Sequence, residues 1–353
     1  MTASAHLARL GAVSRATGSR EIADARRYCA TVLSDLGFAV SEHPFEFSAF
    51  AGRWAAPVAG LLVPALATLI VSARQTRTGW IAIGAVLLAL SLLLGKWSSG
   101  RGVLAAPLFR RRGINPEAVR GGPPKVWLVA HLDSKWQPVP MLARVAGVLT
   151  LGVGLVALVV VSFAAPGAAP WLLGVVWLGA VPLMLSFVGS RNHGTLDNAS
   201  GVAAVLDAAS RVDASRPLGV LITDAEELAL AGARAWASEG WTAPTIAINC
   251  DTVDDDGDLV LMFTGPRPQR LVSALEHAAS SAGEALRALH LIPGILTDSV
   301  ALAPAGWETL TLSRGTLRTL RRIHTSRDTL ATMSGKGISG AADVLARAAT
   351  ELG

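Results

Sequence analysis

The sequence is poor in charge and in cysteine. Only 16% of its 353 residues are charged, whereas 51% are hydrophobic. A mean hydropathy of +0.46 is high for a soluble protein, so we expect part of the chain to lie in lipid. The two cysteines, Cys29 and Cys250, stand far apart and lack the spacing of a metal site. This excludes a disulfide framework, and we expect both to be free thiols.

The missing charge is concentrated in four hydrophobic windows. None contains a charged residue, and each approaches the roughly 20 residues that cross a bilayer as a helix. The windows are residues 54–73, 79–95, 145–165 and 171–188. Tryptophans stand at the window ends or close outside them, where an amphipathic ring prefers the headgroup region. The alternative is a set of long core helices in a large soluble protein.

Short turns join these windows into two transmembrane hairpins, residues 54–95 and 142–188. Two hairpins leave every long polar segment on one side of the membrane. Those segments, residues 1–53, 96–141 and 189–353, are expected to form one discontinuous domain. The first fifty residues hold no apolar run of the length that a signal peptide requires.

The basic residues indicate a membrane rather than a nucleic acid as partner. The net charge is +5 and the isoelectric point is about 9.8, but the positive charge is not gathered on one face with interleaved aromatics. It lies beside the windows, on the side of the polar segments: Arg53, Lys96, Arg101, Arg110, Arg111, Arg112, Lys135, Arg144 and Arg191. The opposite side has only Arg74 and Arg77. Because positive residues stay on the cytoplasmic side, we expect a four-span protein of the cell membrane with its polar domain in the cytoplasm.

The polar segments alternate between helical and strand patterns. Helical spacing is found at residues 20–37, 201–212 and 228–240, and strand patterns at 38–47, 126–130, 218–223 and 245–249. This alternation predicts an α/β fold with a mostly parallel or mixed sheet flanked by helices. In such folds, ligands bind beyond the carboxyl ends of the strands.

Acidic residues and histidines collect at those strand ends. The set comprises His131 and Asp133, Asp197, Glu226 and Glu227, Asp251, and His324. Each one alone has an ordinary explanation, such as a helix cap or a surface histidine. Together they offer oxygen and nitrogen ligands without thiolate, which suits a catalytic zinc site, and a set of this size can hold two ions.

Five motifs carry a resemblance to a known family. The stretches "AHLDS", "GTLDNASGVAAVL", "TDAEELALAGA", "INCDTV" and "HTSRDT" occur in this order. They resemble the di-zinc aminopeptidases of metallopeptidase family 28, whose relatives include glutamate carboxypeptidases and glutaminyl cyclases. The resemblance covers the polar part of the chain and implies the zinc exopeptidase fold with two bound zinc ions.

The resemblance also implies a role for each residue of the set. Asp197 would bridge the two metals. His131 and Asp251 would complete the ligands of one ion, and Glu227 and His324 those of the other. Glu226 would be the general base, which takes a proton from the attacking water and delivers it to the leaving amine.

Four further residues are assigned supporting roles. Asp133, two residues after His131, is expected to accept the other N–H of that imidazole and to support catalysis from behind the ligands. Thr297 and Asp298 would support the pocket, in the place of a Ser-Asp pair that the family tends to have. His193 would line the substrate pocket or lie solvated in a loop. The stretch "LALAGA" departs from the family pattern, but only in helix packing.

The leading hypothesis is a membrane-anchored zinc aminopeptidase that removes N-terminal residues from peptides. The alternatives are a catalytically silent peptidase-like binding or scaffold protein, a glutaminyl cyclase with a single zinc, and a transporter built on the four helices. The hydrophobic windows hold no ionisable residue, which argues against a transport pathway. The retention of a full ligand set together with Glu226 argues against a scaffold.

Overall fold

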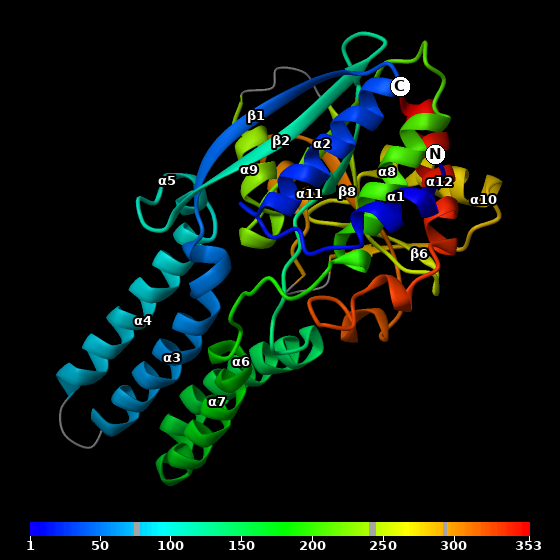
Figure 1. Ribbon diagram of the computed structural model, residues 1–353. Coiled ribbons are helices and arrows are strands. Elements are labelled where there is room, and N and C mark those ends of the chain that lie inside the picture. The colour runs from blue at the N-terminus through cyan, green and yellow to red at the C-terminus, as the bar shows by residue number, and fades with distance from the viewer. Residues whose placement is uncertain (74–77, 240–244, 292–294) are drawn as a thin grey trace. The chain divides into compact units, whose positions relative to one another are not determined.

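The chain divides into two compact units. The computed structural model describes residues 1–73, 78–239, 245–291 and 295–353. The α/β unit comprises Met1–Phe47, Arg111–Trp136 and Gly189–Gly353, and the helical unit comprises Ser48–Arg110 and Gln137–Val188 (Figure 1). The helical unit contains more residues than the two predicted hairpins. It also includes the segments on either side of the first hairpin and residues 137–141 before the second.

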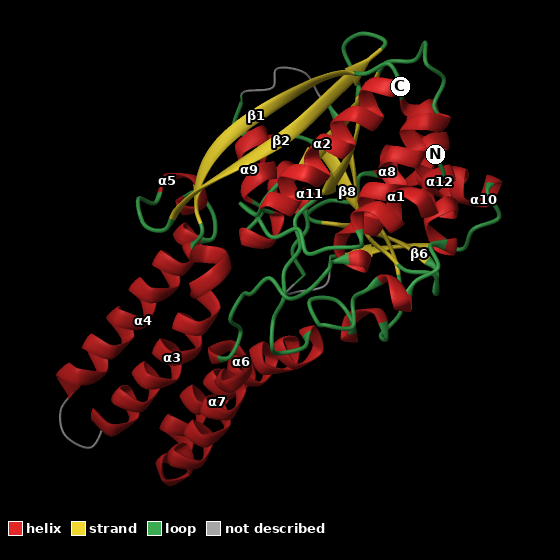
Figure 2. Ribbon diagram, in the orientation of Figure 1, coloured by secondary structure: helices red, strands yellow, loops and turns green. Residues whose placement is uncertain are grey.

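An eight-stranded mixed sheet forms the centre of the α/β unit (Figure 2). The strands are β1 (Ala39–Ser48), β2 (Arg110–Arg120), β3 (Val126–His131), β4 (Leu218–Thr223), β5 (Ile246–Val253), β6 (Leu259–Phe263), β7 (Leu286–His290) and β8 (Glu308–Arg314). Their order is β1-β2-β4-β3-β5-β8-β6-β7. Strands β4, β3, β5 and β8 run parallel, whereas β2 and β6 pair antiparallel with β4 and β8. The predicted α/β fold is confirmed.

The central strands are buried on both faces. Every residue of β3 and of β4 is buried, as their continuous apolar sequences require in a sheet covered on both sides. Trp127 and Val129 join a core cluster with residues of α9 (Ala231–Ala237) and α11 (Asp298–Leu302). Because side chains alternate along a strand, Leu128 and Ala130 point to the opposite face.

Helices cover the faces of this sheet. They are α1 (Ala3–Leu10), α2 (Arg20–Asp35), α8 (Ser200–Arg211), α10 (Gln269–Ser281) and α12 (Lys336–Leu352). Helix α2 begins where the hydroxyl of Ser19 accepts a hydrogen bond from the N–H of Ile22, which is a regular N-cap. Helix α8 is buried along most of its length and packs on β3 and β5, with α1, α2 and α12 beside it.

Strand β2 and helix α9, which flank the site segments, depart from the sequence prediction. Strand β2 was not predicted, because its sequence RRRGINPEAVR carries charge and proline; it lies between β1 and β4. Helix α9 is shorter than the predicted 228–240, since Ala229 and Leu230 have left-handed backbone angles, with φ of 74° and 60°. The chain therefore turns sharply after the Glu226–Glu227 pair before it becomes helical.

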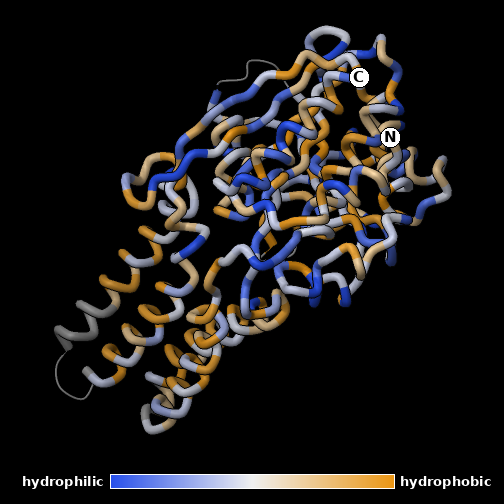
Figure 3. The backbone as a smooth tube through the Cα atoms, in the orientation of Figure 1, coloured by the Kyte–Doolittle hydropathy of each residue, from blue (hydrophilic) through white to orange (hydrophobic). Residues whose placement is uncertain are grey.

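The helical unit is built from four apolar helices and one short one. They are α3 (Phe50–Ala73), α4 (Thr78–Ser98), α5 (Gly102–Ala105), α6 (Met141–Ala164) and α7 (Ala169–Met184). Figure 3 shows that hydrophobic residues dominate the described parts of these helices. Helices α6 and α7 approach closely at Gly179, where an added Cβ would lie 2.6 Å from the main-chain nitrogen of Leu151. Small residues at such crossings are typical of packed apolar helices.

Two of the helices have the length and composition of a membrane span. These are Phe50–Ser72 and Met141–Ser162. The window 171–188 was predicted as a full span, but α7 has 16 residues and ends at Met184, just after Pro182. At the helical rise it covers about 24 Å, short of a hydrocarbon core of about 30 Å. In the window 79–95 the side chains are described only from Ala85, and Arg74 and Arg77 lie outside the described residues. Within the described residues, two helices are thus long and apolar enough to cross a membrane, whereas the sequence predicted four spans.

The buried thiols give a test of the α/β unit. Cys29 lies in α2 with no exposed surface, and burial raises the pKa of its thiol to about 12. Burial also raises the pKa of Cys250. Because the thiolate is the reactive form, only roughly 10⁻⁴ of the Cys29 thiol is ionised at about pH 8. We expect iodoacetamide at this pH to leave both cysteines unmodified in the folded protein and to modify both after denaturation, as measured by mass spectrometry.

An exposed position in the same unit provides the control. Ser280 at the end of α10 is exposed, and a Ser280→Cys variant should react at its new thiol under the same conditions. Rapid alkylation of Cys29 in the folded protein would contradict the packing of α2.

Candidate metal centre

The predicted site residues meet at one edge of the parallel strands. His131 is the last residue of β3, the Glu226–Glu227 pair follows β4, and Asp251 lies in β5. This edge holds the carboxyl ends of the strands, where α/β sheets bind ligands. Asp197 comes from the irregular turn Thr195–Ala199 that leads into α8.

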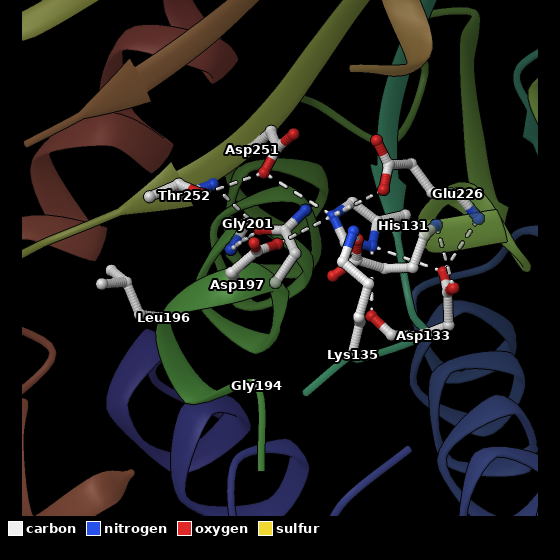
Figure 4. A network of polar contacts seen from close by, with 12 residues as sticks. His131, Asp133, Lys135, Gly194, Leu196, Asp197, Gly201, Glu226, Asp251 and Thr252 are labelled. Atoms are coloured by element: carbon white, nitrogen blue, oxygen red, sulfur yellow. Dashed lines mark hydrogen bonds and ion pairs between the residues drawn. The ribbon is translucent and has the colours of Figure 1, made fainter. Parts of the chain in front are cut away.

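Asp197 lies between two imidazoles. Its Oδ1 is 3.2 Å from Nε2 of His131, and its Oδ2 is 2.9 Å from Nε2 of His324. The close-up in Figure 4 shows the carboxylate beside the His131 ring. One carboxylate with an oxygen toward each histidine has the arrangement of a bridging ligand.

Six side chains form two groups that can each hold an ion. One group is His131, Glu226 and Asp251, and the other is Asp197, Glu227 and His324; within each, the candidate ligand atoms lie within 4.8 Å of one another. All six residues are buried. The first group therefore includes Glu226, which the sequence assigned to proton transfer and not to metal binding.

The donor atoms fit a metal ion. Nε2 of His131 and Oε1 of Glu227 are buried, and within the described part of the chain neither has a hydrogen-bond partner. Buried polar atoms without partners are rare and call for an explanation. Imidazole nitrogen and carboxylate oxygen are ligands that zinc accepts in catalytic sites. A cation between the carboxylates would also offset the cost of burying several negative charges together.

Asp133 supports the site from behind. Its Oδ1 and Oδ2 accept hydrogen bonds from the main-chain N–H groups of Glu226 and Glu227, at 3.0 and 3.1 Å. Its carboxylate also lies 3.4 Å from Nδ1 of His131, whose nearest hydrogen-bond partner is the Asp133 main-chain oxygen at 3.1 Å. Figure 4 shows Asp133 on the side of the ring away from Asp251. These are the contacts of a residue that positions ligands and does not itself react.

Lys135 is a site residue that sequence reasoning missed. Its Nζ is 2.5 Å from Oε2 of Glu227, whose other oxygen lies 3.1 Å from Nε2 of His324. Burial opposes ionisation of Glu227, but His324 and Lys135 lower its pKa to about 2. Glu227 is thus held as a carboxylate with one oxygen toward His324. The sequence treated Lys135 only as a charge near the membrane, although it directly follows the "AHLDS" motif.

The pKa shifts of Glu226 and Asp197 have opposite directions. Burial raises the pKa of Glu226 well above its usual range; His131 opposes this, while Glu227 and Asp251 add to it. For Asp197 burial acts in the same direction, but the neighbouring imidazoles of His131 and His324 lower the pKa. Neighbouring carboxyl groups with pKa values pushed apart are typical of acid-base sites.

Strained backbone is concentrated around the site. Three residues other than glycine have left-handed backbone angles there: Ala225 with a φ of 57°, Thr252 with 61° and His324 with 62°. Ala225 precedes the acidic pair, and Thr252 follows Asp251. Such conformations cost on the order of 1 to 3 kcal/mol each and persist where the surroundings enforce them.

Two buried side chains hold the Asp197 turn in place. Asp328 accepts hydrogen bonds from the N–H groups of Leu196 and Asp197, at 2.6 and 3.2 Å. Asn198 donates to the main-chain oxygen of Cys250 and accepts from the N–H of Thr252. The turn is therefore tied to the strand that carries Asp251. The sequence showed Asp328 within the "HTSRDT" motif but gave it no role.

The supporting residues occupy different places. Asp298 is fully buried; its Oδ2 accepts a hydrogen bond of 2.5 Å from the hydroxyl of Thr223 at the end of β4, and burial raises its pKa to about 7. Thr297 shares a hydrogen bond of 2.8 Å with Thr311. His193 lines a surface cavity of about 580 Å³, together with Val13, Ser14, Ala16, Ser19, Glu21, Ser190 and Arg191.

Comparison with solved structures shows the fold. The aminopeptidase from Aneurinibacillus sp. strain AM-1 is 15% identical, with a TM-score of 0.59 over 98% of this chain and 92% of that one. The glutaminyl cyclase of Fimbriiglobus ruber is 14% identical, with a TM-score of 0.58 over 99% and 94%. A leucine aminopeptidase precursor from Bacteroides thetaiotaomicron is 13% identical, with a TM-score of 0.57 over 99% and 96%.

The sequence itself shows the family. None of the curated proteins matches this chain. The sequence model of peptidase family M28, however, matches residues 116–349. These include all seven of the predicted site residues. This span is more than half of the chain and includes all five motifs of the sequence analysis. The chain therefore belongs to peptidase family M28.

Proposed function

We propose that this protein is a zinc-dependent aminopeptidase held in the membrane by its helical unit. The observation that carries the proposal is the position of Asp197 between His131 and His324, with the acidic pair on the same strand edge. Membership of peptidase family M28 and likeness to two aminopeptidases support it. The site has the ligands that two ions need.

The proposed ligands divide as the sequence resemblance implied. Asp197 would be shared, with His131 and Asp251 on one side and Glu227 and His324 on the other. When bound, zinc supplies a Lewis acid for the scissile carbonyl and lowers the pKa of water. Lys135 and Asp133 keep Glu227 and His131 in place for this.

Glu226 is the proposed general base. Its Oε2 lies 3.9 Å from Nε2 of His131, inside the first ligand group. Its carboxylate would take the proton of the attacking water and pass it to the nitrogen of the leaving amine as the peptide bond breaks. Burial and nearby carboxylates raise its pKa, whereas a bound cation would lower the pKa and favour the carboxylate that accepts the proton.

A glutaminyl cyclase is the second candidate function. The Fimbriiglobus ruber enzyme matches this fold as well as the aminopeptidases do. The sequence resemblance implies a single zinc ion for a glutaminyl cyclase. In this chain the ammonium of Lys135 binds one oxygen of Glu227, and a cation at that place disfavours an ion beside it. The number of bound ions therefore bears on the choice between the two activities.

Membrane attachment is supported by the surface of the helical unit. In the helices Phe50–Ser72 and Met141–Ser162, only 22% of each apolar window is buried. A core helix of a soluble protein would be mostly buried. Exposed side chains include Leu92, Leu93, Val153, Val156 and Leu178. We propose that these helices lie in the bilayer, with α4 and α7 as shorter companions.

The two activities are separated by a substrate panel. Purified in detergent with zinc, the protein should release the N-terminal residue from aminoacyl amides and short peptides, and a chelator should abolish this. An N-terminal glutaminyl peptide should lose glutamine by hydrolysis. Release of ammonia from that peptide without loss of the residue, measured by mass spectrometry, would instead assign the cyclase.

The acidic pair separates base from ligand. Glu226→Gln should reduce turnover by about 10² to 10⁴-fold, the range of a positioned general base, while zinc stays bound. Glu227→Gln should also weaken zinc retention, because it removes a ligand oxygen. Elemental analysis and turnover of the two variants test this. A Glu226→Gln variant with near-normal turnover would show that another group is the base.

The orientation of the α/β unit is tested by reporters. Nine basic residues lie beside the hydrophobic windows, on the side of the polar segments, so the α/β unit and both termini should face the cytoplasm. Alkaline phosphatase fused after Gly353 should be inactive, and a fluorescent protein at the same place should fluoresce. The reverse pair of results would place the site on the outer face.

A further inference from the structure

Arg15 is a buried cation in the N-terminal segment, outside the residues that match the family. The side chain has no exposed surface. Its guanidinium donates only to main-chain carbonyl oxygens among the described contacts: Leu10, Val13 at 3.2 Å, Leu132 at 2.9 Å, His193 at 2.8 Å and Gly194 at 2.8 Å. Because these hydrogen bonds all go to main-chain carbonyls, the buried guanidinium holds segments of the backbone in place.

Those carbonyls belong to the two segments that carry the metal site. Leu132 directly follows His131. Gly194 comes three residues before Asp197. The main chain of Arg15 adds to the junction, because its N–H donates to the hydroxyl of Ser134 at 2.9 Å and its carbonyl accepts from the N–H of Ser134. That hydroxyl in turn donates to the carbonyl of Asn192 at 3.3 Å.

Arg15 and Asp328, two buried side chains of opposite type, thus bind the main chain that leads to Asp197. Arg15 binds the carbonyls of His193 and Gly194 before it, and Asp328 binds the N–H groups of Leu196 and Asp197. The same N-terminal segment reaches the other half of the site, because the hydroxyl of Thr17 donates to Asp133 at 3.3 Å.

These segments approach so closely at Gly194 that no larger residue fits there. Gly194 has a φ of 61°, and a Cβ added there would lie 2.4 Å from Cβ of Ser134 and 2.5 Å from the main-chain oxygen of Asp197. The backbone at Gly194 is therefore pressed against the segment after His131, with the Arg15 guanidinium binding both sides. The junction thus connects the segment that follows His131 with the segment that precedes Asp197.

We propose that Arg15 is a positioning residue of the metal centre, which fixes the bridging carboxylate of Asp197 relative to His131. The proposal rests on the metal site of the proposed function, and it extends that site to a segment outside the family match. Arginine suits the task because its planar group donates five hydrogen bonds in fixed directions. Lysine has one flexible ammonium and cannot bind both segments in the same way.

The test measures zinc affinity and stability separately. In the full-length protein purified in detergent, Arg15→Lys should raise the zinc dissociation constant by about 10 to 100-fold, the range for residues that orient metal ligands. Calorimetry or a competing chelator dye gives the constant, and the thermal midpoint gives stability. Excess zinc should restore the activity that the variant loses at limiting zinc.

Arg120 provides a matched control. It is also buried, and its guanidinium donates to the carbonyls of Leu36, Ala209 and Val212. These carbonyls lie at the ends of helices α2 and α8, not at the metal centre. Arg120→Lys should lower the thermal midpoint and leave the zinc dissociation constant unchanged.

Each result of these measurements supports or overturns the role of Arg15. The proposal is overturned if Arg15→Lys binds zinc as tightly as the wild type, or if Arg120→Lys weakens zinc to the same extent. Should Arg15→Lys fail to fold, Ser134→Ala removes one link of the same junction; it should weaken zinc, and unchanged affinity overturns the proposal. Wild type that binds zinc without cleaving peptides contradicts only the aminopeptidase, whereas wild type that binds no zinc contradicts both.

Discussion

The burial of several carboxylates around two imidazoles is the constraint on which the α/β unit depends. Asp197, Glu226, Glu227 and Asp251 are all almost inaccessible to water. Like charges at such distances repel strongly where water is excluded. The chain holds them together by the hydrogen bonds that Asp133 accepts from the backbone of the acidic pair, by two histidines and by Lys135. A bound cation would offset the repulsion that remains, which is why the cluster suits a metal ion.

The surrounding structure resists relaxation of this cluster. Asp133 binds the backbone of the acidic pair, and Asp328 binds the backbone of the Asp197 turn. Left-handed angles at Ala225, Thr252 and His324 store strain at the same edge of the sheet. Rigid main-chain supports allow charged ligands to stay in a geometry that they would not choose alone.

The α/β unit closes on itself where the chain leaves it after Trp136 and returns to it at Gly189. Trp136 and Gly189 exchange two main-chain hydrogen bonds, at 3.0 and 2.8 Å, where the chain leaves the α/β unit and returns. Lys135 lies immediately before this junction, and Asn192 just after it donates to the Lys135 carbonyl at 2.9 Å. An insertion at this point keeps the residues on either side in contact with each other.

Much of the fold and most of the site follow from the sequence. The apolar runs at 126–130 and 218–223 determine the buried strands, since only a sheet covered on both faces accommodates them. The motif order pointed to His131, Asp197, the acidic pair, Asp251 and His324, because these residues sit at predictable strand and helix ends. Local pattern also identified the apolar helices of the second unit.

The tertiary structure decided what depends on contacts between distant segments. Arg15 meets Ser134 across 119 residues, and Asp328 meets Leu196 across 132. Neither pairing leaves a periodic signal, because hydrophobic spacing reports only which face of one element is buried. The early end of α7 after Pro182 likewise became visible only in the structure. The sequence determined which residues can act as ligands. The packing of the segments around Arg15, Ser134, Asp197 and Asp328 determined how those ligands are held.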